Sequence, residues 1–205
     1  MERTYDASGR QERARQQRAA ALEVARARFL DQGYAATTVE SIAEAAGVSM
    51  ATVYKSYGGK AGLARALCQE ALGGDGPVPA EVRSNAVRSA ADARAIIEGW
   101  GQLTAEVSPL ISPLLLVLRD AALGDPEAAA LRDELDHARL TRMASNARHL
   151  VGTGQLRPGV TSREVRDVLW SCTSPELYEL LVVHRGWTSD RFGRFAADTM
   201  IGSLL

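Results

Sequence analysis

Two short helical segments joined by a tight turn, between residues 37 and 57, restrict the fold of this chain more than any other feature. Gly47 ends the first segment, because glycine adopts the left-handed conformation of such a turn at little cost. Small side chains lie where the two helices would cross, at Ala43, Ala46 and Ala51. This pattern is typical of a helix-turn-helix, whose second helix lies in the major groove of DNA.

A long amphipathic helix is expected before this unit, over about residues 11–32, where apolar residues recur at helical spacing. Gly33 follows it directly and supplies the stop. We expect Phe29 and Tyr34 to pack together across this glycine, as they would in a Schellman motif.

Two capping signals open the helices of the predicted helix-turn-helix. Thr37 lies three residues before Glu40, which is the spacing of a capping box. Ser49 can cap the next helix, which is expected to continue to about Ser56. After a pair of glycines, a fourth helix is expected over about residues 60–72.

The rest of the chain consists of long helical patterns without a convincing strand, and the glycine- and proline-rich segment 73–79 is its strongest loop signal. The helical runs are 80–107, 109–123, 126–151, 162–185 and 189–204. We therefore predict an all-α fold of about nine helices. A three-helix DNA-binding domain with the helix-turn-helix would occupy residues 1–60, with 1–10 as an arm, and a helical effector-binding and dimerisation domain residues 61–205.

Composition is that of a globular protein, since 46% of the residues are hydrophobic and 24% are charged. No stretch approaches the roughly 18 consecutive apolar residues of a membrane span, and the polar start lacks the apolar segment of a secretory signal. The two cysteines, Cys68 and Cys172, fit a reducing compartment. We expect a cytoplasmic protein without a disulfide and without membrane contact.

The net charge of −1 argues at first against a nucleic-acid-binding protein, because phosphate contacts need cations. The charges are unevenly distributed, however. Residues 1–70 hold ten Lys or Arg and eight Asp or Glu, and both lysines of the chain, Lys55 and Lys60, lie there. The N-terminal part is therefore better suited to meet DNA than the average suggests.

The second helix of the predicted helix-turn-helix carries side chains that can donate to phosphates or bases, or contact a thymine methyl group. Lys60 begins the following helix, where free backbone amides and a cation together favour a phosphate. The DNA contacts expected from the sequence are Thr38, Ser49, Met50, Ala51, Thr52, Tyr54, Lys55 and Lys60.

Residues 34–49, YAATTVESIAEAAGVS, and residues 52–63, TVYKSYGGKAGL, resemble the N-terminal domain of the TetR/AcrR family of bacterial regulators. The resemblance implies that Tyr54 and Lys60 hold the DNA backbone and that residues 50–55 read bases. It also implies a homodimeric repressor that is released from a palindromic double-stranded DNA operator by a small-molecule effector.

This sequence departs from the family pattern at two positions near the end of the recognition helix. Tyr57 stands where the family usually has phenylalanine, and this change is tolerated if the hydroxyl reaches water or phosphate. Ser56 stands where an aromatic residue or histidine is common, so no contact is carried over to it from the family.

The tail, from Trp170 to Leu205, resembles the last two helices of that family, which pair between subunits. A single helix-turn-helix reads few base pairs, so a two-fold dimer would double the contact with DNA. Periodicity alone does not separate a partner-facing residue from a core residue. The expected dimer interface is Val165, Val168, Leu169, Leu177, Leu180, Leu181, Phe192, Phe195, Ala196 and Met200.

Large or polar-tipped residues of the body could line an effector pocket or serve ordinary packing. The candidates are Trp100, Arg119, His137, Met143, Trp170 and Tyr178. The three histidines do not have the spacing of a metal site, and no catalytic or phosphate-loop motif occurs. We therefore expect no metal, no cofactor and no enzymatic activity.

Three alternatives stay open at this point. The chain is a regulator, a ligand-binding helical module of the same fold that does not use DNA, or an all-α enzyme, which the missing catalytic motif disfavours. The arginines at positions 3, 10, 13, 15 and 18 either contact phosphates or the minor groove, or belong to a solvated extension.

Overall fold

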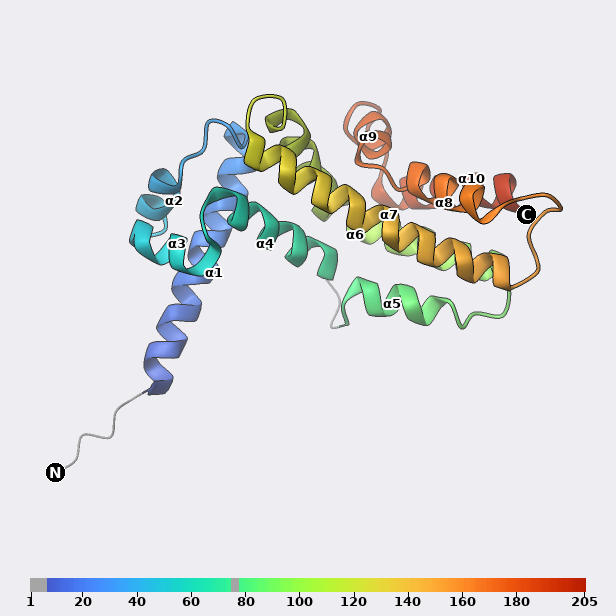
Figure 1. Cartoon of the computed structure of the whole chain (residues 1–205), viewed down its shortest axis with the longest axis horizontal. Helices are drawn as coiled ribbons and strands as arrows, with labels where there is room; N and C mark the ends of the chain where they lie inside the picture. Colours follow the sequence, from blue (N-terminus) through green and yellow to red (C-terminus); the bar gives the residue numbers. More distant parts are fainter. Residues whose placement is uncertain (1–6, 75–77) are drawn as a thin grey trace.

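The computed structural model describes residues 7–74 and 78–205 and confirms the predicted all-α fold (Figure 1). This described part of the chain holds ten α-helices and one π-helical segment, where about nine helices were predicted. They are α1 (Ala7–Gln32), α2 (Val39–Ala45), α3 (Met50–Tyr57), α4 (Lys60–Gly73), α5 (Ala80–Val87), α6 (Ala93–Ala121), α7 (Pro126–Gly152), α8 (Ser162–Cys172), α9 (Pro175–Tyr178), η1 (Glu179–Val183) and α10 (Ser189–Leu204).

Helices α1 to α4 form one end of the molecule, and α5 to α10 form the longer body (Figure 1). The start of α1 projects beyond the rest of this end. Its stop matches the sequence prediction in part. Gly33 has a φ of +83°, and its amide donates to the Phe29 carbonyl at 3.1 Å, which is the single bond of an αL motif rather than a Schellman pair. The Phe29 and Tyr34 rings pack as expected, with centroids 5.2 Å apart.

The prediction that a helix ends at Pro109 is wrong, because α6 continues through both Pro109 and Pro113. Each proline lacks the amide that would bond to the carbonyl four residues earlier. Buried residues on both sides of the prolines, such as Trp100 and Leu118, hold the helix in the protein. Tertiary packing therefore outweighs the local tendency to stop.

Two other predicted runs are divided by helix caps. The run predicted over 80–107 breaks after α5. Asp92 then caps α6 by accepting a hydrogen bond from the Ala95 amide at 2.8 Å. The run over 162–185 breaks where Ser174 caps α9 and Pro175 follows it at the first helical position.

Helix α6 connects two hydrophobic cores. The first contains α1 to α4, the C-terminal half of α6 and the start of α7. The second contains the N-terminal half of α6 with α8, α10 and the end of α7. By length and mean hydropathy alone α6 could cross a membrane, and its buried apolar residues, such as Ile97 and Leu118, belong to these two cores.

Helices α6 and α10 approach each other through small residues. A Cβ atom added at Gly101 would lie 2.7 Å from the Ala197 Cβ and 2.8 Å from the Gly193 carbonyl oxygen. A Cβ atom added at Gly193 would in turn meet the Gly101 carbonyl oxygen and the Ala105 Cβ. Neither position has space for a larger residue.

We predict that Gly193→Ala lowers the free energy of unfolding by about 1–3 kcal/mol, because backbone atoms of α6 must move to admit the methyl group. Gly152→Ala is the matched control, since a Cβ at Gly152 meets no atom within 4 Å. Thermal and urea unfolding followed by circular dichroism measure both. Equal stability of the two variants would contradict the close contact.

Candidate nucleic-acid interface and interior cavity

Helix α2 begins one residue later than the sequence suggested. Thr38, not Thr37, is its N-cap, and the Thr38 hydroxyl accepts a hydrogen bond from the Ser41 amide at 3.1 Å. Thr37 is buried, and its hydroxyl donates to the Gly33 carbonyl at 2.8 Å. The predicted capping box with Glu40 is therefore wrong, because Thr37 serves the preceding turn.

The turn between α2 and α3 has the predicted glycine geometry. Gly47 has a φ of +65°, its amide donates to the Glu44 carbonyl at 3.1 Å, and the Val48 amide donates to the Ala43 carbonyl at 2.9 Å. These two bonds form a Schellman motif that ends α2. Ser49 then caps α3 as predicted, by accepting from the Thr52 amide at 3.1 Å.

Helix α3 has one buried side and one open side. Val53 is fully buried and packs in the first core with Ile42 and Ala43 of α2. The opposite face and the first turn are exposed, and they carry Met50, Ala51, Tyr54 and Lys55, with Ser49 and Thr38 exposed beside them and Thr52 half-buried. The residues of α3 that the sequence predicted to meet DNA therefore share one accessible surface, with Thr52 half-buried at its edge.

Tyr57 at the end of α3 joins the helix-turn-helix to α1. Its hydroxyl donates to the Arg18 carbonyl at 2.9 Å, so the hydroxyl that the family's phenylalanine lacks is satisfied inside the protein. The next turn is equally close, because a Cβ at Gly62 would overlap the Tyr57 carbonyl oxygen. The first contact holds α3 against α1, and the second leaves no space for a side chain at Gly62 where α4 follows α3.

Lys60 does not extend toward the outer face of α3. Its ammonium group donates to the Tyr34 carbonyl at 3.1 Å, lies 4.2 Å from the centre of the Tyr34 ring, and is 3.7 Å from the Asp125 carboxylate. Only 20% of the side chain is exposed. Asp125 also caps α7, so Lys60 connects the start of α4 to the α6–α7 turn. The phosphate contact that the sequence predicted for Lys60 would require its ammonium group to leave Asp125 and turn toward DNA.

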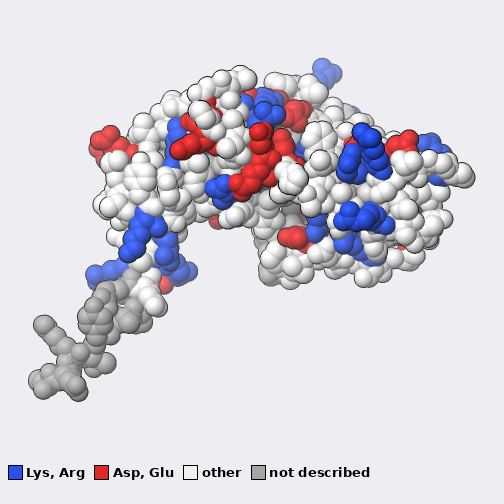
Figure 2. Space-filling view, in the orientation of Figure 1, with Lys and Arg blue, Asp and Glu red and all other residues white. Residues whose placement is uncertain are grey.

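Positive side chains gather on α1 next to the undescribed N-terminal residues (Figure 2). Arg13, Arg15 and Arg18 are exposed there, and Arg15 is paired with Glu12 at 2.8 Å. The predicted arm residue Arg3 and the side chain of Arg10 lie outside the described residues. The three described arginines belong to a helix and not to an unstructured arm.

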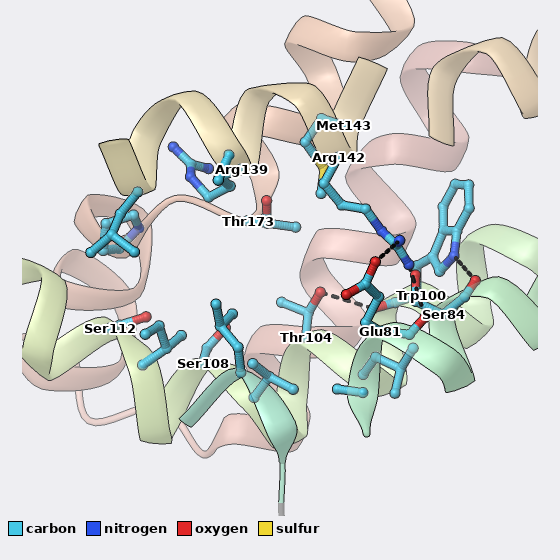
Figure 3. Close-up of a pocket in the computed structure, with 18 of the residues that line it drawn as sticks. Glu81, Ser84, Trp100, Thr104, Ser108, Ser112, Arg139, Arg142, Met143 and Thr173 are labelled. Carbon is cyan, nitrogen blue, oxygen red and sulfur yellow. Dashed lines mark hydrogen bonds and ion pairs between the residues drawn. The ribbon is translucent and has the colours of Figure 1, made fainter. Parts of the chain in front are cut away.

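A partly open cavity of about 710 Å³ lies in the body, lined by residues from α4 to α8, by Pro175 of α9 and by Met200 of α10. Two of the predicted effector residues, Trp100 and Met143, line it. The Trp100 indole donates to the Ser84 carbonyl at 3.2 Å, which fixes the orientation of the ring (Figure 3).

The other four predicted effector residues are not in this cavity. Arg119 binds Glu179 at 2.7 Å and connects α6 to η1. Tyr178 is buried against Phe192, with ring centroids 5.6 Å apart. His137 and Trp170 line a second hollow of about 340 Å³ between α7 and α8.

Sequence reasoning missed the polar residues of the large cavity. Thr104, Ser108 and Ser112 of α6 are buried and follow one another at a spacing of four residues, which places them on one helix face. Arg139 and Arg142 of α7 line the cavity above them (Figure 3). The regular spacing of the three hydroxyls was the available signal.

Half of the predicted dimer interface is core. Five of its side chains are buried within the protomer and cannot face a partner, namely Val165, Leu169, Phe192, Ala196 and Met200. Val168, Leu177 and Leu181 are half-buried, and Leu180 and Phe195 are exposed. Val183, which the sequence analysis missed, is 60% exposed beside Leu180 on η1. Among the described residues, no cluster of His, Cys, Asp or Glu could hold a metal ion.

Comparisons with known proteins give a family match over the helix-turn-helix segment and a shared fold over most of the chain. Residues 21–67 match the family model described as bacterial regulatory proteins, tetR family. A TetR-family transcriptional regulator from Rhodococcus sp. is 16% identical with a TM-score of 0.65, over 92% of this chain and 98% of that one. The SmeT–triclosan complex is 19% identical with a TM-score of 0.70, over 92% and 91%.

A transcriptional regulator from Saccharomonospora viridis in complex with choline is 18% identical with a TM-score of 0.66, over 91% of this chain and 96% of that one. No curated protein sequence matches the chain. At these identities the solved structures show a shared fold, and the family model matches at the helix-turn-helix.

We predict opposite effects for two conservative tyrosine variants. Tyr57→Phe removes the bond to the Arg18 carbonyl and should lower stability by about 0.5–1.5 kcal/mol, with DNA affinity unchanged. Tyr54→Phe removes an exposed hydroxyl and should weaken DNA binding with stability unchanged. Urea unfolding and fluorescence anisotropy with duplex DNA at low salt measure the two quantities. A loss of stability in Tyr54→Phe would contradict its assignment to the open face.

Proposed function

We propose that this chain, a TetR-family regulator by the match of its helix-turn-helix domain, is a homodimeric cytoplasmic repressor that a small-molecule effector releases from a palindromic operator. Residues 1–60 would form the DNA-binding domain and residues 61–205 the effector-binding and dimerisation domain. The observation that carries the proposal is the open face of α3, held outward by the caps at Gly47 and Ser49.

In this proposal α3 lies in the major groove with its first turn toward the base edges. Met50 and Lys55 read bases, and Tyr54 holds the backbone. The exposed arginines of α1, Arg13 and Arg18, add phosphate contacts beside it. Each protomer would read one half-site, and the two half-sites would lie about 34 Å apart, one turn of DNA.

The dimer interface is assigned to the exposed apolar face of η1 and α10. Leu180, Val183 and Phe195 are large apolar residues that the protomer leaves exposed. Trp187 packs edge-on against Phe195, with ring centroids 5.4 Å apart, and extends the same face. Neighbouring exposed apolar side chains of this kind mark a protein interface more often than a free surface.

Binding of an effector in the large cavity is supported by its volume and by its position. A cavity of about 710 Å³ is within the range of small-molecule sites. Two proteins of the same fold are complexes with triclosan and with choline. Lining residues of α4, such as Leu72, place the cavity against the helix that leads into the DNA-binding end.

The effector can act only through its different affinities for two arrangements of α4, and tenfold release of DNA corresponds to about 1.4 kcal/mol. Lys60 lies at the start of α4, held by Asp125 of the α6–α7 turn. We propose that in the DNA-bound arrangement Lys60 leaves Asp125 and binds a DNA phosphate instead.

Selection from random duplex DNA at low salt tests the main proposal. An inverted repeat with half-sites one turn apart is expected, and substitution of Met50 or Lys55 should change the preferred base. Recovery of no preferred sequence would overturn the proposal and favour a ligand-binding helical module that does not use DNA.

We predict that Leu180→Arg combined with Val183→Arg yields a monomer, because charges cannot be buried unpaired in the interface. Affinity for the selected palindrome should fall by about tenfold or more, or 1.4 kcal/mol. Val82→Arg, at an exposed position of α5, is the control and should leave the dimer intact. Analytical ultracentrifugation and gel shifts decide, and an unchanged dimer in the double variant would refute this interface.

We predict that Asp125→Asn strengthens DNA binding, because asparagine still caps α7 but no longer competes for Lys60. A partly exposed ion pair contributes about 0.2–1 kcal/mol, so the dissociation constant should fall about 1.4- to fivefold. Asp133→Asn, on the exposed face of α7, is the control.

Lys60→Ala should weaken binding to all sequences and reduce its salt dependence. In the Lys60→Ala background the effect of Asp125→Asn should disappear, as a double-mutant cycle requires of a coupled pair. Fluorescence anisotropy at two salt concentrations measures all four proteins, and additive effects would rule out the exchange.

A further inference from the structure

We propose that the large cavity binds an elongated, mainly apolar carboxylate, with its carboxylate beside Arg139 and its chain directed toward Trp100. The inference rests on the proposed function in one respect only, namely that this cavity is the effector site. The shape of the cavity, the pairing of its charges and the unpartnered donors of Arg139, in its lining, and of Trp170, beside Arg139, each support it.

The cavity follows α6 from Trp100 to Leu115. At 1.5 Å per residue this stretch is about 22 Å long, so the space is long relative to its volume of about 710 Å³. Leu103, Val107 and Ile111 supply an apolar wall along it. An extended molecule with a long apolar part fits this shape better than a compact one.

The two arginines of the cavity differ in how they are neutralised. Arg142 binds the Glu81 carboxylate at 3.0 Å and donates to the Glu81 carbonyl at 2.9 Å. Arg139 is paired more weakly, because its nearest carboxylate, that of Asp136, which also lines the cavity, lies 4.0 Å away, beyond hydrogen-bond distance, and Glu176 acts on it only through its charge. Its one hydrogen bond is from Nη1 to the Trp170 carbonyl at 2.7 Å. Within residues 7–74 and 78–205, Arg139 is thus the lining arginine without a bonded counter-charge.

Two buried donors next to each other also lack acceptors. Neither Arg139 Nε nor Trp170 Nε1 has a hydrogen-bond partner in the described chain, and the guanidinium lies 4.3 Å from the centre of the Trp170 ring. Buried donors without acceptors are rare in proteins and destabilise them. Burial also lowers the Arg139 pKa, because the positive charge loses contact with water. An anion bound beside this side chain would stabilise that charge again.

The floor of the cavity supplies further donors at the same end. Ser108 and Ser112 project from α6 into the half of the cavity that Arg139 lines, whereas Thr104 lies nearer Trp100 (Figure 3). The Thr104 hydroxyl donates to the Trp100 carbonyl at 2.8 Å, but no hydrogen bond of Ser108 or Ser112 is found among the described residues. A carboxylate held between the two serines and a rotated Arg139 guanidinium would satisfy all three side chains.

Three ten-carbon probes with different head groups test the proposal in the full-length protein by isothermal titration calorimetry. They are decanoate, 1-decanol and decyltrimethylammonium, each below its micelle concentration. We expect decanoate to bind at least about tenfold more tightly than the other two. Similar affinity for all three, tighter binding of the alcohol or the cation, or no binding of any probe would overturn the assignment.

Variants of Arg139 separate charge recognition from folding. Arg139→Gln should reduce decanoate affinity to that of 1-decanol while leaving 1-decanol binding unchanged, which reports an intact cavity. Arg139→Lys should keep part of the preference for decanoate. Arg148→Gln, on the exposed side of α7, is the control and should change neither affinity. A preference for decanoate that survives in Arg139→Gln would overturn the role of this side chain.

Release of DNA is measured separately, by gel shift with the selected operator. If decanoate binds with the Arg139-dependent preference while DNA stays bound, the ligand class is supported and the proposed release fails. The two proposals therefore fail by different results.

Discussion

One hydrophobic core that crosses from the helix-turn-helix into the body is the constraint on which the rest of the structure depends. Leu63 and Leu67 of α4 are fully buried in it, together with Phe29 of α1 and Leu118 of α6. Because interiors pack as densely as crystals, α6 cannot move along this core without moving α4. The orientation of α3 therefore depends on contacts made in the body, and the Tyr57 hydroxyl bond to α1 extends the same dependence.

The cavity lies where this core meets the second one. Ile111 belongs to the first core, Trp100 and Met200 belong to the second, and all three line the cavity. An occupant would thus contact both cores at once. The Lys60–Asp125 contact lies beyond the C-terminal end of α6. There the ammonium group at the start of α4 meets the carboxylate of the α6–α7 turn. Packing and charge together couple the two parts of the molecule.

Local signals were the ones that the sequence could supply. The roles of Gly47 and Ser49 follow from residues less than five positions away, and both predictions were confirmed. The interior of the body was harder, because Val165 and Leu180 show the same helical periodicity although one is buried and the other exposed. The direction of Lys60 depends on Asp125, which is distant in sequence, and no local pattern reports it.

The two prolines of α6 leave its backbone without two hydrogen bonds, next to the serines that line the cavity. Pro109 cannot bond to the Ala105 carbonyl, and Pro113 cannot bond to the Pro109 carbonyl. A helix bends most easily where its ladder is interrupted. Helix α6 should therefore bend most easily near Ser108 and Ser112. A ligand bound beside these two serines would contact the helix at the position where it bends most easily.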